Sequence, residues 1–212
     1  MAYFPFFVDI EGKKCLIAGG GAVAFRKAAA LMEYGPDIVV VAPRVSLKME
    51  ELAKKSGGRL TWKCRKFEES DLDDSDFVIA GTSDAELNRQ ISIWCRERKI
   101  PVNVADVQEE CSFIFPALIK DKDITVGIST GGNSPVLARY LKNKFKNVIP
   151  KGYGCLAKQL GSYRDMVRER VDSQPARRSI FKAMAEEGIR QGGFTREQAE
   201  ELIERKLAEH EK

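Results

Sequence analysis

The chain has 212 residues, of which 43% are hydrophobic, so it can build one good core and a smaller second unit. Its net charge of +4 suits an acidic small molecule at least as well as a nucleic acid, and we expect no nucleic-acid partner. No apolar run approaches the ~20 residues of a membrane span, and the five cysteines form no C-x-x-C pair. We therefore expect a cytoplasmic protein with no membrane partner, disulfide framework or metal site.

The single histidine limits the possible chemistry. His210 lies in the charged stretch Glu-His-Glu-Lys near the end of the sequence, where we expect it to be solvated. Any proton transfer in the body of the protein must then use Asp, Glu, Lys, Tyr or water. Catalytic groups of the Ser-His-Asp and Cys-His types are excluded.

The first half of the chain alternates predicted strands with predicted helices. The predicted strands cover 4–9, 14–18, 38–41, 59–64, 77–80 and 101–105, and the predicted helices cover 22–34, 46–55 and 84–98. Strands that alternate with helices predict an α/β fold with a Rossmann-like, doubly wound parallel sheet.

A glycine turn separates the strand 14–18 from the helix 22–34. Gly19 and Gly21 fill the first two positions of the pattern G-x-G-x-x-G/A, and Ala24 fills the third. The backbone N–H groups at the start of such a helix can hold a pyrophosphate. The neighbouring cations Arg26 and Lys27 oppose the helix dipole unless an anion lies nearby. Together these features predict a dinucleotide site.

The end of the second strand of the sheet, 38–41, lacks the acidic residue that usually binds the ribose hydroxyls of NAD. Ala42, Pro43 and Arg44 stand there instead. Arg44 would favour a 2′-phosphate, and hence NADP, but it would equally stack on adenine or face solvent. The residues alone leave these alternatives open.

Asp106 follows the predicted strand 101–105 directly. Open parallel sheets bind their ligands beyond the carboxyl ends of the strands. Because the body of the chain has no histidine, a carboxylate in this place is the natural acid–base candidate. The alternative is an aspartate that only caps a turn.

The pattern changes near residue 111. The strand-like runs 112–119 and 124–129 predict an antiparallel hairpin, and helices are expected at 135–147, 153–171, 175–190 and 195–211, the last one with a capping box from Thr195 and Gln198. We therefore expect three parts: a nucleotide-binding domain (1–111), a dimerisation segment (112–150) and a helical domain (151–212).

The hairpin segment is too small to bury its own apolar residues, which are Phe113, Phe115, Leu118 and Ile119. A homodimer would bury them, and the alternative is packing against helices of the same chain.

The turn before the helix 135–147 is rich in glycine and hydroxyl groups. Ser134 suits the N-cap and Pro135 the first helical position, which explains both without a function. Gly131 and Gly132, with neighbouring hydroxyls such as that of Thr130, would also hold a substrate carboxylate. Arg139 on the helix would support this, or it belongs to a solvated basic face.

Tyr140 and Lys144 form a Tyr-x-x-x-Lys pair, as in short-chain dehydrogenases. The glycine pattern of that family does not match residues 19–24, so chance explains the pair better. A reductase of that kind remains an alternative function. Another alternative is a non-enzymatic dinucleotide-sensing module, although such modules generally carry the acidic residue that is missing after residue 41.

Several motifs in order resemble the precorrin-2 dehydrogenase family of sirohaem biosynthesis, over about residues 3–150. They are Phe4-Pro5-Phe6-Phe7 ("lPlf"), Gly19 to Lys27 ("GGGxVAxRK"), Val41-Ala42-Pro43, Ala80 to Asp84 with Asn88 ("AaTdd…vN"), Asn103 to Asp106 ("vNvvD"), Ser112 to Pro116 ("sFi.Pa") and Ser129 to Pro135 with Ala138-Arg139 ("sSgGtSPvlAr"). Thr130 departs from the pattern, since some bifunctional members carry a phosphorylatable serine there.

The resemblance implies NAD+-dependent oxidation of precorrin-2, a tetrapyrrole, to sirohydrochlorin by a homodimer joined through its middle segment. Some members also insert iron, a point that the sequence leaves open here. The resemblance implies that Asp106 is the key carboxylate and that NAD is bound by Gly19, Gly21, Ala22, Val23, Pro43, Arg44 and Thr82. The carboxylates of precorrin-2 suit the turn and helix that contain Thr130, Gly131, Gly132, Ser134 and Arg139.

Overall fold

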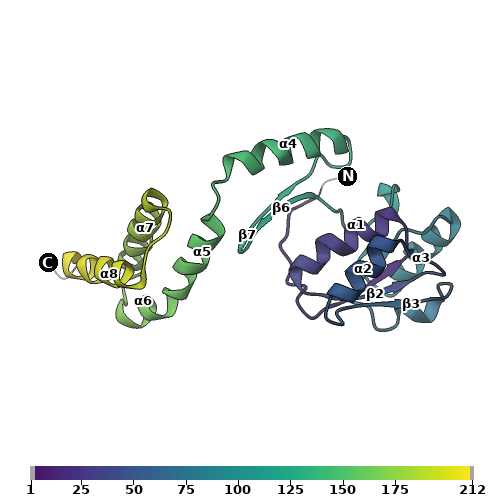
Figure 1. Cartoon of the computed structure of the whole chain (residues 1–212), viewed down its shortest axis with the longest axis horizontal. Coiled ribbons are helices and arrows are strands. Elements are labelled where there is room, and N and C mark those ends of the chain that lie inside the picture. The colour runs from purple at the N-terminus through teal and green to yellow at the C-terminus, as the bar shows by residue number, and fades with distance from the viewer. Residues whose placement is uncertain (1–2, 211–212) are drawn as a thin grey trace. The chain divides into compact units, whose positions relative to one another are not determined.

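The computed structural model describes residues 3–210, and the chain forms two compact units, Met1–Phe115 and Pro116–Lys212 (Figure 1). The side chain of His210, expected to be solvated, lies outside the described part of the chain. A separate dimerisation segment at 112–150 and helical domain at 151–212 remain predictions.

The first unit contains the predicted parallel sheet. Its strand order is β3-β2-β1-β4-β5, and all neighbouring strands run parallel. The strands are β1 (Lys14–Ala18), β2 (Asp37–Val41), β3 (Leu60–Lys63), β4 (Phe77–Ala80) and β5 (Val102–Val104). The helices are α1 (Ala22–Leu31), α2 (Leu47–Lys55) and α3 (Ala85–Glu97), with short 3-10 turns η1 (Met32–Tyr34), η2 (Glu69–Leu72) and η3 (Gln108–Glu110). The Rossmann-like prediction is confirmed.

The two faces of the sheet form two apolar cores. In β1, Cys15 and Ile17 pack with α1 and α2, whereas Leu16 and Ala18 pack with α3. Figure 1 accordingly shows α1 and α2 together on one side of the sheet. A strand that is buried on both faces reads as a continuous apolar run, which is why β1 and β4 were recognisable in the sequence.

The strand predicted at 4–9 is wrong. None of these residues is in a strand, and Phe4, Phe6, Phe7 and Val8 are between 73% and 80% exposed. Pro5 has no N–H group to contribute to a ladder. Residues 111–112 cover the outer edge of β5: the Ser112 N–H donates to the Val102 carbonyl, and the Val102 N–H donates to Ser112 Oγ, both at 2.8 Å.

The predicted hairpin begins later than expected, because residues 112–116 form no strand. Phe113 and Phe115 pack against the core that contains α1, and the Phe113 ring meets the Phe77 ring edge-on at 6.4 Å. The first unit therefore partly buries these two aromatics itself, because the segment after β5 turns back onto the sheet. This agrees with the alternative of packing within the same chain for these two residues, and the expected homodimer stays a prediction.

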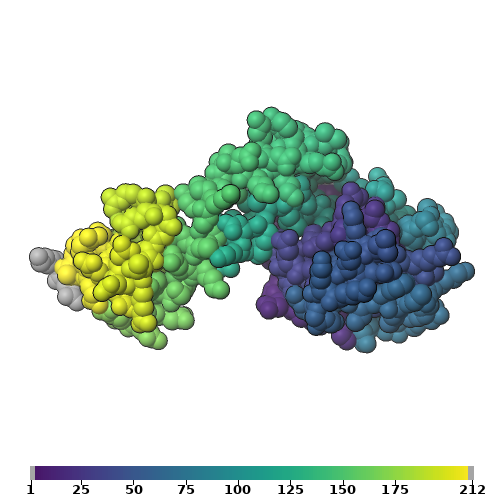
Figure 2. All heavy atoms as spheres, viewed as in Figure 1, coloured from purple at the N-terminus to yellow at the C-terminus, as the bar shows by residue number. Residues whose placement is uncertain are grey.

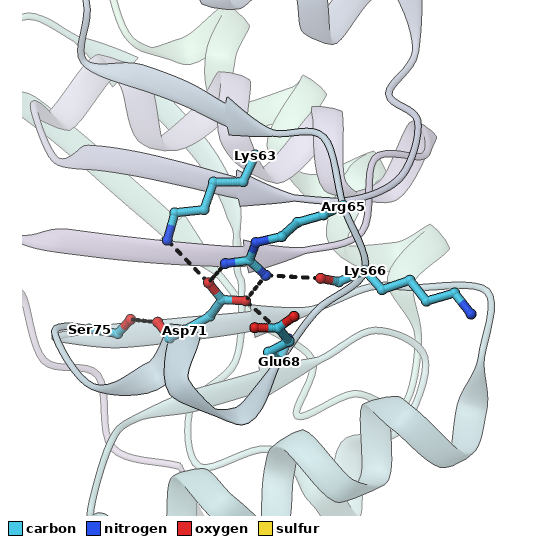
Figure 3. Close-up of polar contacts among 6 residues, drawn as sticks. All are labelled: Lys63, Arg65, Lys66, Glu68, Asp71 and Ser75. Carbon is cyan, nitrogen blue, oxygen red and sulfur yellow. Dashed lines mark hydrogen bonds and ion pairs between the residues drawn. The ribbon is translucent and has the colours of Figure 1, made fainter.

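A buried carboxylate fixes the loop after β3 (Figure 3). The side chain of Asp71 is 1% exposed and accepts two hydrogen bonds from the Arg65 guanidinium, at 2.5 and 2.7 Å. Lys63 Nζ donates to the same carboxylate at 3.1 Å, and the Glu68 N–H donates at 3.0 Å. Burial alone would raise the pKa of Asp71, but these donors outweigh it and lower the pKa to about 2.

We expect Asp71→Asn to lower the free energy of unfolding by about 2 kcal/mol at neutral pH. The folded pKa lies below the ordinary value of 3.8, so this stabilisation is present above that value and disappears as the pH falls through about 2. Urea denaturation at neutral and acid pH measures the difference between wild type and variant. Asp74→Asn is the control, because that side chain is 89% exposed. Equal stability of wild type and Asp71→Asn at neutral pH would contradict the assignment.

The second unit has a hairpin and five helices among its described residues. They are β6 (Ala117–Asp121), β7 (Ile124–Ile128), α4 (Pro135–Val148), α5 (Tyr153–Ser162), α6 (Arg164–Arg170), α7 (Gln174–Gln191) and α8 (Arg196–His210). The helix predicted at 153–171 is divided at Tyr163, after the weak helix formers Gly161 and Ser162. The predicted capping box is confirmed: the Gln198 N–H donates to Thr195 Oγ1 at 3.2 Å, and the Thr195 N–H donates to Gln198 Oε1 at 2.8 Å. Within 3–210, no helix has the length and apolar character to span a membrane.

Candidate active site

The glycine turn after β1 brings three loops together. Gly19 has φ +112°, and a Cβ there would lie 2.3 Å from the Gly81 carbonyl oxygen in the loop after β4. A Cβ on Gly20 would lie 2.2 Å from the Arg44 carbonyl oxygen in the loop after β2. Gly20 is therefore as necessary to the fold as Gly19. The general pattern G-x-G-x-x-G/A does not specify Gly20, because it allows any residue in the middle position, whereas the family motif GGGxVAxRK includes it.

Gly21 differs from both neighbours. It is the N-cap of α1 with extended backbone, φ −79° and ψ −172°, and a Cβ there would meet nothing within 4 Å. The first-turn N–H groups of Ala22 and Val23 have no acceptor within their own helix. Open space in front of these donors, at the positive end of the helix dipole, fits a pyrophosphate. The predicted residues thus form a turn suited to NAD.

Lys27 does not belong to this anion site. Its ammonium donates to Asn103 Oδ1 on β5 at 2.5 Å and lies 4.4 Å from the centre of the Phe115 ring. Burial lowers its pKa, although the Asp106 carboxylate nearby opposes this. The interpretation of Arg26 and Lys27 as a sign of a bound anion therefore fails for Lys27, which links α1 to β5.

The loop after β4 is held by a buried amide. Asn88 Oδ1, on α3, accepts from the Thr82 N–H at 3.0 Å and from Thr82 Oγ1 at 2.8 Å, and Asn88 Nδ2 donates to the Thr82 carbonyl at 3.1 Å. Thr82 thus lies beside Gly19 in a fixed conformation. The sequence motif that contains Thr82 also contains Asn88, because the Asn88 amide fixes the Thr82 backbone and hydroxyl.

Pro43 and Arg44 follow β2 and are exposed. Trp62 on β3 donates its indole N–H to the Ala42 carbonyl at 2.8 Å, which fixes the start of this loop. No carboxylate stands at 42–44, the usual place of the group that binds the ribose.

Asp106 lies at the same edge of the sheet as the glycine turn. Ala18 on β1 pairs with Ala80 on β4, and Ala80 pairs with Val104 on β5. The loops that follow these three residues therefore leave the sheet at the same edge. Two strand spacings, about 10 Å, separate the ends of β1 and β5. Asp106 is exposed and has φ +64°, a left-handed conformation that aspartate tolerates better than most residues. The structure thus brings the candidate acid–base group to the predicted nucleotide edge.

The glycine-rich turn before α4 belongs to the second unit. Ser134 Oγ accepts from the Leu137 N–H at 3.2 Å, which confirms the predicted N-cap. Thr130 Oγ1 accepts from the Ser134 N–H at 3.1 Å and donates to the Ser134 carbonyl at 3.0 Å. Gly131 and Gly132 have φ +64° and +87°, and Arg139 is exposed on α4. That this turn and Arg139 bind substrate stays a prediction.

Among residues 3–210, no group of three or more His, Cys, Asp or Glu side chains is placed to hold a metal ion.

Known proteins resemble the chain in both units. A family model described as "Putative NAD(P)-binding" matches residues 6–117, and one described as "Sirohaem biosynthesis protein central" matches residues 121–147. A sirohaem synthase of Nitrosospira multiformis is 42% identical over 183 residues, and one of Nitrosococcus oceani is 35% identical over 209 residues. These matches confirm the resemblance seen in the sequence motifs.

The extent of the matches differs between sequence and structure. The alignments cover 85% and 98% of this chain but only 39% and 44% of the two sirohaem synthases, so the chain spans about two fifths of these relatives. A solved structure of SirC, a precorrin-2 dehydrogenase, superimposes with a TM-score of 0.74 at 24% identity, covering 97% of this chain and all of that one. The superposition shows that the two proteins share a fold.

Proposed function

Because the chain belongs to the NAD(P)-binding family whose model spans residues 6–117, we propose that it oxidises precorrin-2 to sirohydrochlorin with NAD+. One observation carries the proposal: the glycine turn after β1 and Asp106 after β5 both lie at the carboxyl edge of the same parallel sheet. A nucleotide-binding turn and an acid–base carboxylate are the two groups that such an oxidation requires. The names of the sirohaem synthases and of SirC supply the substrate class.

We assign each group one role in this oxidation. NAD+, when bound, supplies a hydride acceptor. The N–H groups of Ala22 and Val23 hold its pyrophosphate, and the rigid Thr82 loop borders the same turn. Oxidation removes a hydride and a proton from precorrin-2, and Asp106 accepts that proton and releases it to solvent. Gly131, Gly132 and Arg139 in the second unit bind carboxylates of the substrate.

All five cysteines are unpaired thiols, as expected in a reducing compartment, and the proposal therefore includes a cytoplasmic location. The proposal is limited to the oxidation and includes no iron insertion.

We expect NAD+ to be preferred over NADP+, in agreement with the family resemblance and against the simplest interpretation of Arg44. Arg44 is exposed, and its loop is fixed at the Ala42 carbonyl by the Trp62 indole N–H, not by the Arg44 side chain. Steady-state kinetics with each cofactor measures the preference. A kcat/KM for NADP+ equal to or above that for NAD+ would overturn it.

We also expect a homodimer formed largely by residues 112–147, which contain the hairpin and most of α4. The apolar side chains of α4 lie open at the surface of the second unit, where Figure 2 shows this helix in green. Val136 and Val148 are 80% and 72% exposed, and Ala138 is the buried residue of α4. A second copy would cover this face. Light scattering at micromolar concentration measures the mass, and a stable monomer would exclude the dimer.

The experiment that separates the functions is turnover of precorrin-2 with NAD+ by wild type and Tyr140→Phe. Tyr140 is 55% exposed, and Lys144 Nζ lies 5.6 Å from the centre of its ring. Undiminished turnover in the variant supports the proposal. Loss of turnover in Tyr140→Phe would favour a short-chain type of reductase, and binding of NAD+ without any turnover would favour a sensing module.

A further inference from the structure

One thiol joins the two ends of the turn that carries Asp106. The Cys111 Sγ accepts a hydrogen bond from the Val104 N–H at 3.1 Å. It also lies 3.2 Å from the carbonyl oxygens of both Val104 and Val107, so the thiol proton can be donated to either. Val104 and Val107 stand on either side of Asp106. The thiol therefore closes the loop in which the carboxylate sits.

This loop needs such support, because Asp106 has φ +64°. Left-handed conformations of residues other than glycine persist only where the surroundings determine them. The loop is also beyond the last strand pair, since β5 pairs with β4 only up to Val104. The last hydrogen bond of this ladder runs from the Ala105 N–H to the Ala80 carbonyl at 2.8 Å, one residue before Asp106.

The thiol is itself held from the interior. Asn103 Nδ2 lies 3.5 Å from Cys111 Sγ and donates to the Phe113 carbonyl at 2.9 Å. The Lys27 ammonium donates to Oδ1 of the same Asn103 amide and so fixes its orientation. Burial raises the pKa of Cys111, so the group stays protonated and can donate at neutral pH. A chain of contacts thus runs from α1 through Asn103 to the thiol.

We infer that Cys111 is a positioning residue that holds Asp106 in its catalytic orientation by clamping the backbone of Val104 and Val107. The inference rests on the proposed function, because the orientation of Asp106 affects turnover only if this carboxylate takes part in the reaction. The described contacts of Cys111 are with backbone groups and with Asn103, which makes it a positioning residue and not a catalytic one.

We expect Cys111→Ala to lower kcat at least about tenfold, because small displacements of a catalytic group reduce rates strongly. KM for NAD+ should change less than about twofold, because the glycine turn is untouched. Cys111→Ser retains a donor and an acceptor on a shorter bond, and should recover kcat to within about threefold of wild type. Binding of NAD+ at full stoichiometry confirms that each variant is folded.

Ser112→Ala is the matched control. Ser112 Oγ accepts from the Val102 N–H on the same edge of β5 but makes no contact with the Asp106 loop in the contacts described for it. Loss of the Ser112 hydroxyl should therefore lower the free energy of unfolding about as much as Cys111→Ala does, while kcat stays near the wild-type value. Equal kcat values in Cys111→Ala and Ser112→Ala would overturn the inference.

A double-mutant cycle with Asp106→Ala tests whether Cys111 acts through Asp106. If it does, Cys111→Ala lowers kcat in the wild-type background and has no further effect when Asp106 is already alanine. Multiplied losses would show that Cys111 acts independently of Asp106 and would overturn the inference while the proposed function stands. A wild-type rate in Asp106→Ala alone would instead remove the catalytic role of this carboxylate, and the inference with it.

Discussion

Gly21→Asp is expected to weaken NAD+ binding at least about a hundredfold while the protein folds normally. A carboxylate within about 4 Å of a pyrophosphate costs several kcal/mol at the effective dielectric of a protein surface, which is enough for this loss. The fold tolerates the change, because a Cβ on Gly21 meets nothing within 4 Å and its backbone is extended. Aspartate is also a favourable N-cap residue, so Tm should stay constant or rise.

Calorimetric titration with NAD+ and a thermal melt measure the two effects. Gly21→Asn is the matched variant, because it adds nearly the same volume without the charge, and it should bind NAD+ more tightly than Gly21→Asp. A variant that loses binding while Tm is unchanged identifies a ligand site and excludes simple unfolding. Wild-type affinity for NAD+ in Gly21→Asp would show that the pyrophosphate does not bind at this turn.

Asp106→Asn is expected to lower dehydrogenase kcat at least about a hundredfold, with NAD+ affinity within a few-fold of wild type. A positioned general base contributes about 10²–10⁴-fold to a rate. Asparagine adopts the left-handed conformation at φ +64° as readily as aspartate, so this variant removes the charge without straining the loop. Asp106→Ala should be at least as slow, because alanine adds backbone strain to the loss of the carboxylate.

The comparison of the two variants separates the possible roles of the carboxylate. If Asp106 accepts a proton, asparagine and alanine should both be slow. If Asp106 only orients the substrate through a hydrogen bond, asparagine should recover much of the rate. Near-wild-type turnover in both variants, with folding verified by circular dichroism, would remove Asp106 from the mechanism.

The sequence predicted those parts of the molecule that depend on local pattern. The apolar runs of β1 and β4, the glycines after β1 and the cap at Ser134 all carry their signals within a few residues. Asp106 was predicted as the acid–base candidate for the same reason, since the end of a parallel strand is a general ligand position; the structure confirms its position at that edge, and its role stays a prediction. The strand at 4–9 was wrong because an apolar run does not specify a partner strand.

Contacts between distant residues were beyond sequence reasoning. Lys27 was interpreted with Arg26 as part of an anion site, whereas its side chain reaches Asn103, 76 positions away. The contacts of Cys111 with Val104 and Val107 and the ion pair of Asp71 with Arg65 join residues only four to seven positions apart, but they depend on loop conformations that no local pattern specifies. A widely spaced cysteine and an aspartate in an acidic stretch carry no local sign of these roles.

The most direct test of the central claim is a single-turnover experiment without oxygen, with the protein in excess over precorrin-2 and NAD+ present. The absorbance of NADH and that of sirohydrochlorin are followed together. The proposed function predicts that both appear at the same rate and in equal amounts. Sirohydrochlorin without NADH, or no conversion by protein that binds NAD+ at full stoichiometry, would contradict it.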